Sequence, residues 1–99
     1  MKDLVRWRAE IDAIDARILR LLSRRAQIAV KVGKLKKISG LPYRSREREH
    51  ILLARLLRAN RGPLDKRSIS KVFRVVMRET LRVEENHASS RRQNKRTFQ

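Results

Sequence analysis

The sequence of 99 residues contains no cysteine and few aromatic residues, and it has no long apolar run. Without cysteine it cannot form disulfides or cysteine-based metal sites, and two isolated histidines, His50 and His87, do not predict a metal centre. An apolar run of roughly 20 residues would be needed to cross a bilayer, and the first residues lack the apolar segment of a secretory signal. We therefore expect a soluble, cytoplasmic protein of one domain.

Basic residues are what the sequence has in excess. It holds 27 Lys and Arg against 10 Asp and Glu, a formal charge of +17. This charge favours an anionic partner such as nucleic acid, phosphate or a small carboxylate, but a solvated basic surface explains it equally well. Residues 87–99 contain no acid and are rich in polar residues, so we expect a basic, disordered tail after a folded domain over residues 1–86.

A long helix is predicted over residues 3–37. Positions in alternating steps of three and four form a heptad seam there, and all of them but Arg25 are apolar. The seam consists of Leu4, Trp7, Ile11, Ile14, Ile18, Leu21, Arg25, Ile28, Val32 and Leu35. About 35 residues rise roughly 50 Å, whereas a compact chain of this size is roughly 33 Å across. We therefore expect a second chain to cover part of this helix.

Two further helices follow, separated by loops that contain proline and glycine. The second is predicted over residues 45–60, with Ser45 as its N-cap, and the third over residues 65–85. The sequence shows no strand pattern and no internal repeat. The expected fold is all-α, with one long and two shorter helices per chain.

Polar residues at apolar positions are the candidates for function. Arg25 occupies a seam position, and a buried guanidinium is costly unless it meets an anion, either a carboxylate of the chain or a ligand. With few acids available, we favour the ligand. Lys36 lies roughly 16 Å further along the helix, within reach of the same ligand, whereas Arg8 lies roughly 25 Å before Arg25. If Arg8 binds that ligand, it must do so from a partner chain, and taken by itself Arg8 is better explained as a solvated charge.

The third helix places Thr80 and Glu84 four residues apart on its apolar stripe. The threonine is explained as an ordinary core residue, but a carboxylate among apolar groups is unusual and tends to keep its proton. Arg48 and Glu49 open the second helix, where charge needs no functional explanation. The chain offers no nucleophile and no glycine-rich phosphate loop. This inventory favours a reaction driven by positioning and electrostatics, without covalent chemistry.

From about residue 7 to residue 85 the sequence resembles the all-helical (type II) chorismate mutases. The resemblance is carried, in order, by RAEIDAID at 8–15, LLSRR at 21–25, IAVKVGKLK at 28–36, Pro42 with Arg48-Glu49 six residues later, NRGPL at 60–64, and Ile69 with residues 72–74. Members of this family convert chorismate to prephenate, a step toward phenylalanine and tyrosine. The resemblance implies an intertwined homodimer with two equivalent sites and no metal or cofactor.

The resemblance also implies a role for each residue of the long helix singled out above. Arg8 matches the arginine that each chain donates to the other chain's site. Arg25 matches the arginine that grips a substrate carboxylate. Lys36 matches the lysine that binds a carboxylate and the ether oxygen.

Four residues of the other helices match as well. Arg48 and Glu49 match an Arg-Glu pair whose glutamate holds the ring hydroxyl, and Thr80 falls near the ring carboxylate. Glu84 faces the ether oxygen, where it helps only if protonated, so we expect activity to fall as pH rises. The catalytic residues are thus expected to be Lys36, Glu84 and Arg25. One departure is Ser45, where many relatives have aspartate, which leaves a capping or main-chain role at that position.

Three alternatives stay open from the sequence. An isochorismate-pyruvate lyase of the same fold would use the same cationic pocket on a related substrate. A basic helical nucleic-acid-binding protein would explain the charge and the tail. A regulatory dimer without activity would explain Ser45.

Overall fold

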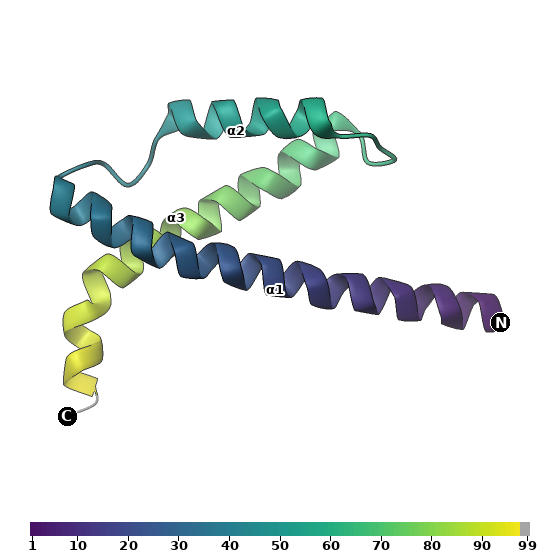
Figure 1. Ribbon diagram of the computed structural model, residues 1–99, viewed down its shortest axis with the longest axis horizontal. Helices are drawn as coiled ribbons and strands as arrows, with labels where there is room; N and C mark the ends of the chain where they lie inside the picture. The colour runs from purple at the N-terminus through teal and green to yellow at the C-terminus, as the bar shows by residue number, and fades with distance from the viewer. Residues whose placement is uncertain (98–99) are drawn as a thin grey trace.

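The computed structural model consists of three helices joined by two loops, and it describes the backbone of residues 1–97 and the side chains of residues 1–87. The helices are α1 (Lys2–Ser39), α2 (Arg46–Ala59) and α3 (Lys66–Thr97) (Figure 1). The described part of the chain contains no strand. The predicted all-α fold of three helices is confirmed.

The end of α1 is set by Gly40. This residue adopts a φ of 68°, a left-handed conformation that suits glycine because it has no Cβ. The backbone N–H of Leu41 then donates to the carbonyl oxygen of Lys36 at 2.9 Å, which satisfies a helix-terminal acceptor. Lys36 and Lys37 lie in the last turn, where the helix dipole favours cations.

The start of α2 is capped as predicted. Ser45 Oγ accepts a hydrogen bond from the backbone N–H of Arg48 at 3.1 Å, and Glu47 and Glu49 lie in the first turn. Asp65 does the same for α3, because its Oδ1 accepts from the backbone N–H of Ser68 at 2.8 Å. The capping role that the sequence left for Ser45 is therefore confirmed.

The end of α3 differs from the prediction. The helix was expected to end near Glu85, but its backbone continues to Thr97, because residues 86–97 contain neither glycine nor proline to stop it. The helical backbone thus extends into the region predicted as a basic tail. The side chains of residues 88–99, and residues 98–99 altogether, lie outside the described residues, so a separate, disordered tail over 87–99 stays a prediction.

The helix α3 joins the other two. It packs against α1 and against α2, whereas α1 and α2 do not contact each other (Figure 1). On α1 the buried residues are Ala29 and Gly33, one helical turn apart. The packed half of α1 is therefore its C-terminal half, residues 25–39.

The N-terminal half of α1, residues 2–24, projects away from the rest of the chain. Each of its side chains is exposed, and the apolar seam is 41–69% uncovered at Leu4, Trp7, Ile11, Ile14, Ile18, Leu21 and its neighbour Leu22. The molecule extends 53 Å with a radius of gyration of 17.5 Å, against about 13 Å for a compact domain of this length. This half of the heptad seam is thus left without a partner among the residues that the structure describes.

Within residues 1–97 no helix combines the length and the apolar character required to cross a bilayer. The cytoplasmic location expected from the sequence stays a prediction.

Candidate active site

A cavity of about 510 Å³ lies where the C-terminal half of α1 meets the 40–45 loop, the start of α2 and the middle of α3. Its volume suits a small organic ligand. Six of the seven residues predicted to form the site line this cavity: Arg25, Lys36, Arg48, Glu49, Thr80 and Glu84. The structure brings together residues up to 59 positions apart in the sequence, from Arg25 to Glu84.

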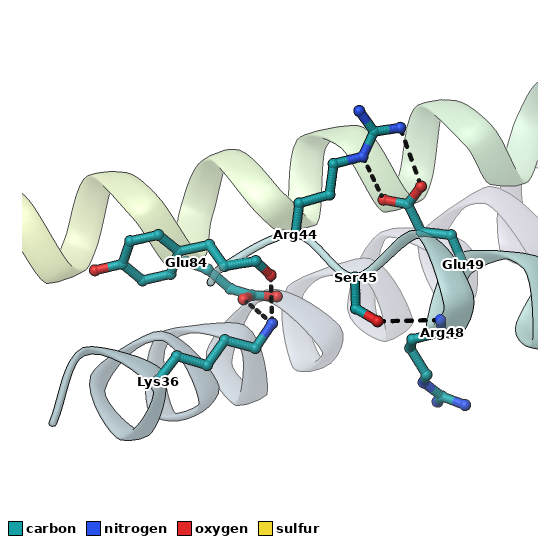
Figure 2. A network of polar contacts seen from close by, with 7 residues as sticks. Lys36, Arg44, Ser45, Arg48, Glu49 and Glu84 are labelled. Carbon is teal, nitrogen blue, oxygen red and sulfur yellow. Dashed lines mark hydrogen bonds and ion pairs between the residues drawn. The ribbon is translucent and has the colours of Figure 1, made fainter. Parts of the chain in front are cut away.

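Lys36 and Glu84 form an ion pair across the α1–α3 contact. Lys36 Nζ lies 2.8 Å from Glu84 Oε1, with side chains 22% and 12% exposed (Figure 2). The same ammonium donates to the carbonyl oxygen of Tyr43, which ties the 40–45 loop to α1. A pair this sheltered is only weakly screened by solvent. The lysine is thereby held in place, with one N–H left for a ligand.

Arg25 is held by Thr80. The guanidinium Nη1 donates to Thr80 Oγ1, and the threonine hydroxyl donates to the carbonyl oxygen of Val76 at 2.7 Å. Because its proton is used on Val76, the hydroxyl presents a lone pair to Arg25. Thr80 therefore has a specific role as an acceptor.

The electrostatic environment of Arg25 is unfavourable for a cation. Partial burial lowers the pKa of its guanidinium below the ordinary value, the charge of Arg48 lowers it further, and the charge of Glu84 opposes both. An arginine nevertheless keeps its proton in proteins. An anion bound between Arg25 and Arg48 would relieve this repulsion.

Glu49 is oriented by a residue that the sequence analysis missed. Arg44 Nε and Nη2 donate to the two carboxylate oxygens of Glu49 at 3.3 and 3.2 Å (Figure 2). Arg44 was overlooked because its place in the loop follows no periodic pattern. Its position between Pro42 and the N-cap Ser45, close to an Arg-Glu pair, was the only available signal. Tyr43 was missed for a similar reason, because it contacts Lys36 through its carbonyl oxygen.

The charges that line the cavity do not cancel. Four basic side chains face two carboxylates: Arg25, Lys36, Arg44 and Arg48 against Glu49 and Glu84. Lys36 and Arg44 are paired with the two glutamates. Among the residues that the structure describes, Arg25 and Arg48 have no ion pair with a carboxylate. The cavity therefore has an excess of positive charge, which favours an anionic ligand.

Arg8 is the one predicted site residue that the single chain does not bring to the cavity. It lies on the exposed N-terminal half of α1, 17 residues before Arg25. That separation is roughly 25 Å along the helix, beyond the reach of an arginine side chain. Its assignment to the site of a partner chain stays a prediction.

Comparison with known protein families gives a match over most of the chain. The sequence model of the family "Chorismate mutase type II" matches residues 7–85. Among solved structures, the chorismate mutase (Form II) of Thermus thermophilus superposes with a TM-score of 0.77 at 37% sequence identity. The match covers 79% of this chain and 89% of that one.

Two similar curated proteins are longer and carry two activities in their names. The bifunctional chorismate mutase/prephenate dehydratase of Neisseria gonorrhoeae is 49% identical over 81 residues, which cover 82% of this chain and 22% of the relative. The protein of the same name from Aquifex aeolicus is 34% identical over 88 residues, which cover 85% of this chain and 24% of the relative. The chain thus spans less than a quarter of the length of these relatives.

Proposed function

The chain belongs to the type II chorismate mutase family, and from this premise we propose that it converts chorismate to prephenate. We propose this activity for the matched domain alone, because the longer relatives have a second activity in their names. Chorismate is a dianion that rearranges within itself by breaking one C–O bond and forming one C–C bond. Such a reaction needs positioning and charge stabilisation, and no nucleophile.

One observation carries the proposal. Arg25 and Arg48, the two guanidinium groups of the cavity without a carboxylate partner, match in number the two carboxylates of the substrate. Guanidinium groups bind carboxylates through paired, charge-assisted hydrogen bonds. Two such contacts would fix the substrate at both ends and select its compact, reactive conformer.

The remaining residues act on the reacting centre. Lys36 Nζ, held by Glu84 and the Tyr43 carbonyl, donates to the ether oxygen, where negative charge develops as the C–O bond breaks. Thr80 fixes Arg25, and Glu49 accepts a hydrogen bond from the ring hydroxyl while Arg44 holds its carboxylate in place. These groups are in position before the substrate binds, so little reorganisation is needed during the reaction.

In this proposal Lys36 and Glu84 approach the ether oxygen of the substrate from different sides. Without substrate it accepts a hydrogen bond from Lys36. An ionised carboxylate would repel the developing charge, whereas a carboxylic acid donates to it. Glu84→Gln, whose amide N–H can donate at this position, therefore tests whether the reaction needs a donor here.

We propose that the enzyme works as a homodimer. The seam on residues 2–24 of α1 leaves large apolar side chains exposed, which favours burial against another helix. Its spacing is that of helices that pack against each other in pairs. A second copy would bring its Arg8 near the cavity that the first chain's own Arg8 cannot reach. Each site would then be completed by the other chain.

Mixed dimers test the donation of Arg8. Arg8→Ala and Arg25→Ala homodimers should each be nearly inactive, but an equal mixture, after subunit exchange, should recover about a quarter of the parent activity. Half of the dimers are then mixed, and each mixed dimer has one complete site. No recovery, with subunit exchange confirmed by mass spectrometry, would show that Arg8 serves its own chain or no site.

The activity itself is tested by incubating the purified protein with chorismate and following chorismate loss and prephenate formation by chromatography. We expect turnover by the parent and near-loss in Arg25→Ala with unchanged helical circular dichroism. A folded dimer without turnover would refute the proposal. Pyruvate release from isochorismate, measured in parallel, would instead identify a lyase.

A further inference from the structure

The crossing of α1 and α3 is unusually close at Gly33. This residue is buried, and a Cβ placed on it would lie 2.6 Å from the backbone oxygen of Glu84, 2.9 Å from its Cα and 3.0 Å from its carbonyl carbon. Carbon atoms in favourable contact lie about 3.5–4.0 Å apart. A side chain at position 33 would therefore force the backbone of α3 away from α1.

The residue whose backbone contacts Gly33 is also a residue of the site. Glu84 extends its side chain to Lys36, three residues after Gly33 and so on the same face of α1. The 2.8 Å contact between Lys36 Nζ and Glu84 Oε1 lies beside the close crossing. The close crossing of α1 and α3 therefore determines both the separation of their backbones and the length of the Lys36–Glu84 ion pair.

The presence of glycine at position 33 requires a structural explanation. It lies inside a helix of 38 residues, where glycine is disfavoured relative to alanine. It has no positive φ, which the chain shows at Gly40 and Gly62, so conformation does not require it. Within the described part of the chain, the backbone of Glu84 occupies the space that a side chain at position 33 would need.

We propose that Gly33 is a positioning residue of the active site: its missing side chain allows α3 to approach α1 until Glu84 reaches Lys36. The inference rests on the proposed function for its activity readout. The effect should be largest at Glu84, because Arg25 and Lys36 share α1 and keep their relative positions, and Thr80 lies one helical turn away from the crossing on α3. Glu84 lies at the crossing and is displaced first.

The test is Gly33→Ala, with Gln27→Ala as the matched control on the exposed side of the same helix. We expect Gly33→Ala to keep its helical circular dichroism and to lower kcat/KM roughly tenfold to a hundredfold, as a displacement of about 1 Å in an active site does. Gln27→Ala should leave kcat/KM unchanged. Parent-like activity in a folded Gly33→Ala protein would overturn the proposal. Loss of folding in Gly33→Ala while Glu84→Ala folds would also overturn it, because Gly33 would then serve the fold.

A double-mutant cycle separates positioning from a general loss of activity. If Gly33 acts through Glu84, adding Gly33→Ala to Glu84→Ala should change kcat/KM by less than about twofold. An equal loss in both backgrounds would show a merely structural effect and contradict the proposal.

A crystal structure of Gly33→Ala provides a readout that needs no activity. The distance from Lys36 Nζ to Glu84 Oε1 should lengthen beyond about 3.5 Å, the limit of a hydrogen bond. An unchanged 2.8 Å distance would refute the inference even if the mutase reaction is confirmed. A lengthened distance in a protein without mutase activity would instead show that the proposed function alone has failed.

Discussion

The two halves of α1 are built from similar sequence and have different surroundings. Residues 2–24 repeat apolar side chains at heptad spacing, and these side chains remain exposed. Residues 25–39 continue the same heptad pattern, but there the seam residues Arg25, Ile28 and Val32 line the cavity. They lie beside Ala29 and Gly33, the buried residues of α1. One helix therefore offers an apolar seam for a partner in its N-terminal half and packs on its own chain in its C-terminal half.

This difference shows how a short chain can share one helix between two tasks. Close packing on α3 requires small residues, because the backbones approach until the Glu84 carbonyl lies against Gly33. The seam instead carries large apolar residues, which bury more area per side chain. The following four predictions test this division of α1 and the site beside its packed half, from the largest expected effect to the smallest.

The largest effect is expected for a charge on the seam. Ile14→Glu removes an apolar side chain worth roughly 2 kcal/mol of burial from each chain, or about 4 kcal/mol per dimer. The dissociation constant should then rise by roughly a thousandfold, as measured by sedimentation at several concentrations. Ala16→Glu places the same charge on the opposite face of the helix and should leave the dimer intact. Equal behaviour of the two variants would refute the seam as an interface.

The second prediction concerns two adjacent arginines at the junction of the halves. Arg25 lines the cavity, whereas Arg24 is exposed. Arg25→Lys keeps the charge but loses the planar fork that binds both Thr80 and a carboxylate, so kcat/KM should fall roughly tenfold to a hundredfold. Arg24→Lys should have no effect. If Arg25→Lys is as active as the parent, the site needs only a positive charge there.

The third prediction concerns Glu84, on the helix that packs against this half of α1. Glu84→Gln keeps the length of the side chain and places an amide N–H where a donor to the ether oxygen is expected, whereas Glu84→Ala removes the side chain. We therefore expect kcat/KM to fall roughly tenfold or more in Glu84→Ala and much less in Glu84→Gln. Equal losses in the two variants would show that no donor is needed at this position.

The smallest effect is expected outside α1, at the support of Glu49. The Arg44–Glu49 pair is partly exposed, with side chains 54% and 29% accessible, and such pairs contribute at most about 1 kcal/mol. Arg44→Gln should therefore raise KM by no more than about fivefold and leave kcat nearly unchanged. Arg46→Gln, close to it in the sequence, provides the control. A large fall in kcat would mean that Arg44 touches the substrate.

The local sequence predicted the helices well where capping or breaking residues mark their ends. The ends of α1 and α2 lie within two residues of the predicted ones, because Gly40 and Ser45 act through their own backbone and side chain. The end of α3 was wrong because no such residue follows Glu85. Charge pattern alone does not stop a helix.

The sequence predicted which residues form the site more fully than it predicted the contacts between them. A polar residue on an apolar stripe is visible in the sequence, and this pointed to Arg25, Thr80 and Glu84. The family resemblance added Arg48 and Glu49. The hydrogen bonds that hold these residues, above all from Arg44 to Glu49, depend on the path of a loop that has no period.

The sequence by itself determined three helices, a seam too long for one chain to cover, and an arginine where that seam should be apolar. These features are local or periodic, so the order of residues along one helix is enough to specify them. Only the tertiary structure decided that Lys36 meets Glu84, that Thr80 accepts from Arg25, and that α3 crosses α1 at Gly33. Contacts between helices depend on crossing angle and separation, which are fixed by the packing of both surfaces together.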